Sequence, residues 1–249
     1  MADGLEQSHS GRLTTGTSTY TPSGVLNNSG RSEMHKYNEK GELVKPWEPG
    51  LFSVTTILDI THKAALQAWI DRVGKEEAER KRDEAAQRGD RVHKWISDFL
   101  KEEVELPYDE DMVPYLEGWK NWLPPFTHFT DIQSEVFLHS DKYGFAGSAD
   151  IVCSLGDEPW IIDLKTGAPQ QTHGLQLKGY QQMYYEMTGI KARMAGLYLG
   201  TGTKKQWKIK EYKEPLYVFL AHKHIFDWQM KKSPIRVPRP EYTGGRITL

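Results

Sequence analysis

Residues 127–200 constrain the fold more than any other part of the chain. Three segments with the alternating pattern of β-strands follow one another there, joined by short turns at Asp141–Lys142 and Leu155–Glu158. They read THFTDIQSEVFLHS, GFAGSADIVCSL and PWIIDLKT. A helical segment that ends at Gly189 and a further strand, RMAGLYLG, come next. Strands in this order predict an α/β fold built on a central mixed sheet.

Helical segments flank the predicted sheet. Apolar spacing predicts helices over residues 54–61, 64–74, 76–101, 111–122 and 215–231. Ser53 is placed to cap the first of them. A short hairpin over 35–48 and a strand over 205–213 complete the pattern. The N-terminal half is therefore expected to be mainly helical.

Composition limits the organisation of the chain and its setting. Residues 1–33 are rich in Gly, Ser and Thr and predict a flexible tail, whereas 34–249 have no repeat or linker and indicate one domain. No apolar run approaches the roughly 18 residues that span a bilayer, and no secretory signal is present. A single cysteine, Cys153, excludes an internal disulfide and a four-cysteine metal site. These features favour a cytoplasmic, reducing location and no membrane association.

Charge alone does not identify a binding partner. The formal net charge is −2, which argues against a general nucleic-acid coat protein. Two local stretches are nevertheless basic, namely Arg80–Arg91 and KQWKIKEYK, whose alternation puts Lys208, Lys210 and Tyr212 on one face. Such residues can bind phosphates without reading sequence, although a solvated charged surface has the same pattern.

The segment IIDLKTG carries the first candidate chemistry. Side chains at i and i+2 of a strand share a face, so Asp163 and Lys165 point the same way, and Ile162 and Leu164 point the other. A simple ion pair would also explain an aspartate and a lysine at this spacing. The preceding strand supplies the second observation that a functional site needs.

A tight hairpin sets Asp150 against Asp163. If Leu155–Glu158 form the loop, Ser154 pairs with Pro159, and counting outward puts the two aspartates opposite each other. Directly opposed strand residues have Cβ atoms about 5 Å apart, so two aspartates there repel, and one must stay protonated or a cation must lie between them. Oxygen ligands of this kind suit Mg²⁺ or Mn²⁺, and the backbone carbonyl of Leu164 could add another.

At this point the chain resembles a known family, the PD-(D/E)xK nuclease superfamily, and within it the RecB-like, phage-exonuclease branch. The resemblance rests on an ordered set of motifs over residues 50–200. They are SVTTIL, RGDRVH, SEVFL with Glu135, GSAD, IIDLKTG and QLKGY. The mitochondrial genome maintenance exonuclease has a similar set. The resemblance implies a restriction-endonuclease-like core, with a central mixed β-sheet flanked by helices and a helical N-terminal region.

The resemblance also implies residue roles. Asp150 and Asp163 match the metal-binding carboxylates, and His93 matches a histidine that adds a metal ligand. Lys165 matches the lysine that activates or orients the attacking water. A lysine with a lowered pKa could take the proton from that water; otherwise its charge positions the water.

Three further residues complete the predicted site. Glu135 stands where several family members have an acidic residue facing the site. Gln176 and Tyr180 are four apart and share a helix face, and they match the motif that supports the site and the DNA strand.

The sequence therefore predicts a Mg²⁺- or Mn²⁺-dependent deoxyribonuclease that leaves 5′-phosphates, most simply an exonuclease of recombination, repair or replication, with a phage as one candidate source. A structure-specific or single-strand endonuclease on the same fold, and a non-cleaving nucleic-acid-binding module, stay open as alternatives. The expected partner is DNA, bound largely without sequence preference. An annealing protein, a helicase or a polymerase is expected as a protein partner by family analogy only.

Overall fold

The computed structural model describes residues 34–45, 50–61, 64–101, 108–123 and 129–230. The predicted tail at 1–33 and the segment after 230 lie outside these described residues. Among the described residues no helix has the length and apolar character required to cross a bilayer.

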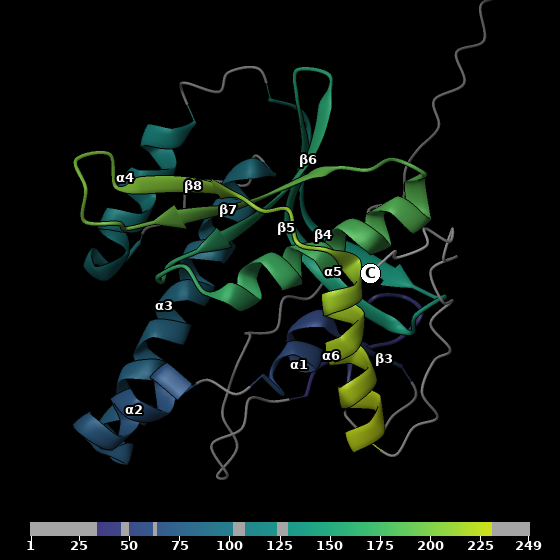
Figure 1. Cartoon of the computed structure of the whole chain (residues 1–249). Helices are drawn as coiled ribbons and strands as arrows, with labels where there is room; N and C mark the ends of the chain where they lie inside the picture. Colours follow the sequence, from purple (N-terminus) through teal and green to yellow (C-terminus); the bar gives the residue numbers. More distant parts are fainter. Residues whose placement is uncertain (1–33, 46–49, 62–63, 102–107, 124–128, 231–249) are drawn as a thin grey trace, which may run out of the picture.

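The strands form one mixed sheet with helices on both faces, which confirms the predicted fold class (Figure 1). The strands are β1 (Lys36–Tyr37), β2 (Leu43–Val44), β3 (Leu51–Ser53), β4 (Phe129–Ser140), β5 (Phe145–Leu155), β6 (Glu158–Lys165), β7 (Arg193–Leu199) and β8 (Trp207–Glu211). The helices are α1 (Val54–Leu58), α2 (Ala64–Val73), α3 (Lys75–Leu100), α4 (Val113–Trp122), α5 (Gln171–Thr188) and α6 (Leu216–Gln229), with a 3₁₀ turn at Glu110–Met112.

The edge of strand β5 that faces away from β4 is shared by two partners. Strand β4 pairs along the length of β5, while β6 pairs antiparallel with residues 151–155 and β3 pairs parallel with residues 145–146 on the other side. Because a strand has only two edges, residues 147–150 of β5 lie between these two partners and pair with neither. We call this interval the fork; Asp150 lies at its end.

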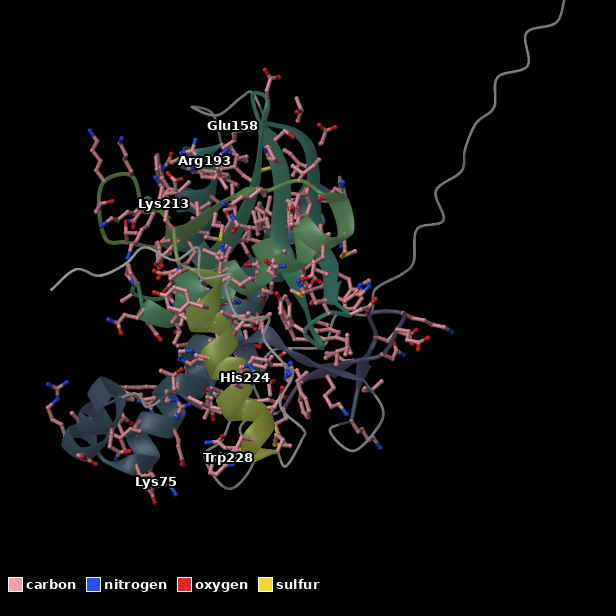
Figure 2. The ribbon with its side chains drawn as sticks, turned by 45° about the vertical axis from the view of Figure 1, so that its right-hand side comes forward. Lys75, Glu158, Arg193, Lys213, His224 and Trp228 are labelled. Atoms are coloured by element: carbon pink, nitrogen blue, oxygen red, sulfur yellow. The ribbon has the colours of Figure 1, made fainter. Side chains whose placement is uncertain are left out.

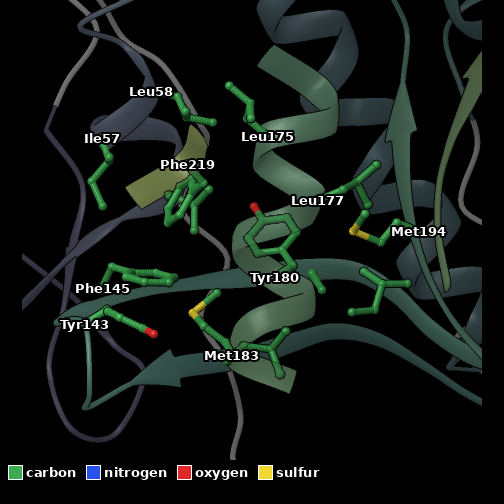
Figure 3. Close-up of a cluster of buried hydrophobic side chains, with 14 of the residues drawn as sticks. Ile57, Leu58, Tyr143, Phe145, Leu175, Leu177, Tyr180, Met183, Met194 and Phe219 are labelled. Carbon is green, nitrogen blue, oxygen red and sulfur yellow. The ribbon is translucent and has the colours of Figure 1, made fainter. Parts of the chain in front are cut away.

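Each face of the sheet is covered by a different set of helices. On one face α1, α5 and α6 pack through Leu177, Phe219 and Phe145, and the Tyr180 ring lies among them (Figure 3). On the other face α3 and α4 pack through aromatic and aliphatic side chains such as Trp119 and Ile162. Strands β5 and β6 are buried on both faces, so the fork lies inside the protein and not at an edge of the sheet.

Local signals explain most helix boundaries. Ser53 accepts a hydrogen bond from the Thr56 N–H and so caps α1, as predicted. Gly189 ends α5 in the left-handed conformation, with φ 75°. Two predicted boundaries are wrong. Helix α1 ends at Leu58 and not at residue 61, since Thr61 N–H bonds the Leu58 carbonyl in a tighter turn. Helix α4 starts at Val113, after a 3₁₀ turn, because proline fits only the first helical turn.

Gly118 tests the packing of α4 on the β7–β8 connection. A Cβ on Gly118 would lie 2.2 Å from the backbone oxygen of Gln206, and that oxygen also accepts the Gly200 N–H. Because a backbone atom cannot move aside cheaply, Gly118→Ala should lower the free energy of unfolding by about 3 kcal/mol. Urea denaturation measures this. Gly167→Ala, whose Cβ would enter open space, is the matched control and should change stability little.

Candidate functional site

The predicted site residues come from five elements that meet at the fork. His93 lies on α3, Glu135 on β4, Asp150 on β5, Asp163, Leu164 and Lys165 on β6, and Gln176 and Tyr180 on α5. The hairpin register is as predicted, with Ser154 opposite Pro159 and pairing that continues to Ile151 opposite Ile162. The strands part at the next residue, so Asp150 and Asp163 stand where the ladder opens.

Asp150 bonds to the backbone of the neighbouring strand. Its Oδ2 accepts a hydrogen bond from the Leu164 N–H at 2.6 Å, and its Oδ1 lies 3.6 Å from His93 Nδ1. Burial opposes ionisation of Asp150, but the charge and hydrogen bond of His93 outweigh it, so the pKa of Asp150 is lowered. Burial likewise opposes the charging of His93, yet the Asp150 carboxylate raises the pKa of His93. The two groups therefore form an ion pair beside the fork.

Asp163 is almost completely enclosed. It is 1% exposed, and Lys165 Nζ lies 2.5 Å from its Oδ2. Oδ2 makes this ion pair but no hydrogen bond of good geometry to any described residue. Burial raises the pKa of Asp163 to about 6; Lys165 opposes this rise, and the nearby charge of Asp150 adds to it. Asp163 is thus a buried carboxylate with spare acceptor capacity.

A chain of hydrogen bonds orients Lys165. Its ammonium donates to Gln176 Oε1 at 3.2 Å, and Gln176 Nε2 donates to the Tyr180 hydroxyl at 3.0 Å. An ammonium can only donate, so it fixes the amide orientation of Gln176. The Tyr180 ring packs closely on Gly147, since a Cβ on Gly147 would lie only 2.7 Å from the ring. The predicted pair on α5 therefore contacts Lys165 and the fork.

Lys165 is stabilised in its charged form by the neighbouring carboxylates. Burial favours its neutral form, but the carboxylates of Asp163 and Asp150 outweigh burial and raise the pKa of Lys165.

Glu135 has an unusual backbone. It stands opposite Asp150, since Ser134 pairs with Ile151 and Val136 with Ala149, and its φ is 53°. The left-handed region costs a non-glycine residue roughly 1–2 kcal/mol, and such strain tends to be retained at functional sites. The Ser148 hydroxyl donates to Glu135 Oε2 at 3.2 Å. Burial, followed by the charge of Asp150, raises the pKa of Glu135 to about 7.

Sequence reasoning missed a buried chain that docks the start of α5. His173 Nδ1 accepts the Gln170 N–H at 3.4 Å, so the ring nitrogen is unprotonated there. The Tyr198 hydroxyl, 2.9 Å away, must therefore donate to it, and the Tyr212 hydroxyl donates to Tyr198 at 2.5 Å. Tyr198 pairs with Lys165 across β6 and β7. The parallel register could have indicated Tyr198, but nothing in the sequence indicates His173.

The donor set at the fork fits a hard divalent ion. The buried carboxylate of Asp163, with an oxygen that lacks a hydrogen bond, and the largely enclosed carboxylate of Asp150 are the kind of donors that Mg²⁺ and Mn²⁺ prefer. Among the described residues no group of three or more His, Cys, Asp or Glu side chains is close enough to hold an ion. Mg²⁺ does not require such a group, because it is typically held by one or two carboxylates, water and substrate phosphates.

Comparisons with known proteins identify the family. A family model described as the PD-(D/E)XK nuclease superfamily matches residues 60–233, and no curated protein matches the sequence. Among solved structures, the protein designated SSO0001 is 16% identical with a TM-score of 0.39, covering 76% of this chain and 80% of its own. A Eubacterium rectale protein named as a candidate exonuclease is 10% identical with a TM-score of 0.37, covering 58% of this chain and 65% of its own. Neither likeness carries a functional argument.

Glu135→Gly should separate strain from function. Glycine adopts φ 53° freely, so the variant should gain up to about 1 kcal/mol of stability. Thermal unfolding measures this gain. Glu135→Gln keeps the backbone strain and is the matched control, so it should gain less. Equal stability of the two variants would contradict the assignment of strain to this residue.

His173 should make the fold acid-sensitive. Burial, assisted by the charges of Lys165 and Lys210, lowers the pKa of His173 to about 3. The unfolded chain therefore binds a proton as the pH falls through about 6.5 and the folded chain does not, so stability declines from there toward pH 3. If the pKa of His173 is lowered fully to about 3, the free energy of unfolding falls by about 2 kcal/mol between neutral pH and pH 5. We expect roughly half of this loss of stability, because solvent reaches part of the ring.

Urea titrations at pH 7.5 and 5 measure this decline. In His173→Gln the difference between the two pH values should shrink, although the variant is less stable at both. His224→Gln, on α6 and distant from this hydrogen-bond chain, is the control (Figure 2). A shrinkage of the same size in His224→Gln would refute the assignment to His173.

Proposed function

The chain belongs to the PD-(D/E)XK nuclease superfamily, and on that premise we propose that it is a Mg²⁺- or Mn²⁺-dependent deoxyribonuclease of the RecB-like type. Its reaction is hydrolysis of DNA phosphodiesters to 5′-phosphate ends, and its mode is exonucleolytic. Residues 34–249 form the nuclease domain, and the biological setting is recombination, repair or replication in the cytoplasm, including a host cytoplasm if a phage encodes it.

One observation carries the proposal. The fork brings together a buried carboxylate, Asp163, whose Oδ2 contacts the Lys165 ammonium but accepts no hydrogen bond, and a largely enclosed one, Asp150, whose side chain is 14% exposed. Placing two carboxylates so close in a largely enclosed site costs stability, and such a cost tends to be retained where a function requires both groups.

Asp150 and Asp163 would hold the ion, with the Leu164 carbonyl and His93 as further ligands. When bound, the ion neutralises the phosphate, lowers the pKa of a water and stabilises the leaving 3′-oxygen. For Asp163 to accept an ion, the Lys165 ammonium has to share or leave Oδ2, which it now contacts. The Leu164 N–H meanwhile keeps Asp150 Oδ2 in place.

The remaining residues prepare the site for a phosphate. Lys165, freed from part of its contact with Asp163, directs its charge at a non-bridging phosphate oxygen or at the attacking water. Gln176 and Tyr180 keep the ammonium from rotating away, because the amide receives it at a fixed angle. Glu135 places a third acid next to Asp150, where it can orient a water.

A variant series tests the proposal. Asp163→Asn should cut the rate at least about 10³-fold, since it removes a charge that the ion needs. Lys165→Ala should cut the rate about 10²-fold, the usual effect of losing one transition-state contact. Each variant breaks the buried Asp163–Lys165 ion pair and should lose stability, so circular dichroism and urea denaturation must show that each is folded at the assay temperature before its rate is compared. Asp98→Asn, a buried aspartate paired with Lys94 on α3, is the matched control and should retain activity.

The assay uses end-labelled single- and double-stranded DNA beside a covalently closed circle, each with Mg²⁺, Mn²⁺ or EDTA. Degradation of linear DNA alone supports an exonuclease. Cleavage of the circle would favour the structure-specific or single-strand endonuclease. No cleavage with any divalent ion, together with no Mg²⁺ uptake in calorimetry, would favour a non-cleaving binding module. Annealing, helicase or polymerase partners can be sought by pull-down once activity is known.

A further inference from the structure

We propose that the edge strand β8 is the DNA-backbone grip of this protein, with Lys208 and Lys210 contacting phosphates beside the scissile one. The inference rests on the proposed function for the identity of the polyanion. It goes further by assigning a binding surface to one of the two basic stretches in the sequence.

The sheet register connects β8 to the fork. Asp163 pairs with Gly196 of β7, and Gly196 pairs with Lys210 of β8. Two residues further along β6, Lys165 pairs with Tyr198 of β7, and Tyr198 pairs with Lys208 of β8. Residues paired across strands share a face, so both lysines lie on the face that carries the site residues.

Gly196 stands between the site and the edge strand, and the buried Tyr198 ring covers it, since a Cβ on Gly196 would lie 3.0 Å from that ring. Asp163 and Lys210 are therefore separated by a single residue position along the sheet register. Strand β8 is the last strand of the sheet, so Lys208 and Lys210 are exposed at the rim.

Ion pairing distinguishes the two basic stretches. On α3, Arg80 is bound to Glu77 and Glu84, Lys81 to Glu77, and Arg91 to Asp109 and Asp111. In contrast, the lysines around β8 form no ion pair with any residue in the described ranges. They are Lys204, Lys205, Lys208, Lys210 and Lys213. Arg80, Lys81 and Arg91 are thus neutralised by neighbouring acids, whereas the lysines around β8 remain available to a polyanion.

The one glutamate on β8, Glu211, does not cancel the positive charge of Lys208 and Lys210. Glu211 is on the other face of the strand, where Arg193 Nη2 lies 2.8 Å from its Oε2. Lys210 Nζ lies 4.5 Å from the centre of the Tyr212 ring, which restricts the lysine to the rim. The surface is therefore positive on the side that faces the site.

The spacing fits one strand of nucleic acid. Neighbouring strands of a sheet are about 4.8 Å apart, so β8 lies about 10 Å from β6. In duplex DNA successive base steps of one strand rise about 3.4 Å, so this distance corresponds to roughly three nucleotides. Lys208 and Lys210 would thus contact phosphates two to three nucleotides from the cut.

Salt dependence of binding tests the grip directly. Anisotropy with labelled DNA, without divalent ions, gives the slope of log Kd against log salt concentration for the full chain. The double variant Lys208→Gln/Lys210→Gln should lower the magnitude of that slope by about 1.4 on single strands or about 1.8 on duplex, since each lost phosphate contact removes about 0.7 or 0.9. In cleavage assays KM should rise while kcat stays near wild type, because binding away from the reacting atoms is uniform.

The control removes two lysines elsewhere. Lys75 lies on the projecting helices, away from Lys213 (Figure 2), and Lys142 lies in the β4–β5 turn. Lys75→Gln/Lys142→Gln makes the same change in net charge and should leave the slope unaltered. An unchanged slope in the β8 variant, or an equal fall in the control, would overturn the proposal. If the wild-type chain never cleaves DNA but the Lys208→Gln/Lys210→Gln variant still shows the expected loss of slope, the proposed nuclease activity is refuted. The proposed role of β8 in binding the DNA backbone is then supported.

Discussion

The architecture depends on how two buried carboxylates are accommodated inside a sheet. Asp150 and Asp163 lie on adjacent strands at the point where β6 leaves β5 and before β3 takes its place. An unbroken ladder there would press the carboxylates together with nothing between them. Because the strands part, a side-chain oxygen of Asp150 can take the Leu164 N–H that a ladder bond would otherwise use. The same parting creates room for a cation.

Helix α5 stabilises this arrangement from one side. Its N-terminal end is docked to β7 by the His173–Tyr198–Tyr212 chain, and one turn later Gln176 receives the Lys165 ammonium. Tyr180 then packs on Gly147, inside the unpaired interval of β5. Buried polar chains of this kind favour one arrangement because any shift leaves a donor unsatisfied. The helix therefore fixes the lysine relative to both aspartates.

The sequence predicted the parts of this site that follow from strand periodicity and hairpin length. The predicted loop over Leu155–Glu158 sets Ser154 opposite Pro159, and the period of two then puts Asp150 and Asp163 on one face; in the structure the turn is shorter, because Leu155 also pairs with Glu158. The left-handed φ of Glu135 could not be predicted in this way, because strand periodicity assigns an ordinary extended conformation to a glutamate inside a strand. Strand periodicity could not predict the fork either, because β3, which lies almost a hundred residues earlier in the chain, pairs with β5 there.

The distribution of charge explains how a chain with net charge −2 can act on a polyanion. Several acids on α3, and Glu211 on β8, neutralise neighbouring cations, and of the acids at the fork Asp163 is buried while Asp150 and Glu135 are partly buried. Across the sheet the row then runs from Glu135, Asp150 and Asp163 through Gly196 to Lys210. A phosphate strand that approaches along this row meets the exposed lysines first and the carboxylates only where an ion offsets their repulsion. The net charge of the whole chain therefore does not predict whether it binds DNA. The electrostatic field at the sheet edge depends instead on the lysines around β8 that form no ion pair with the described residues.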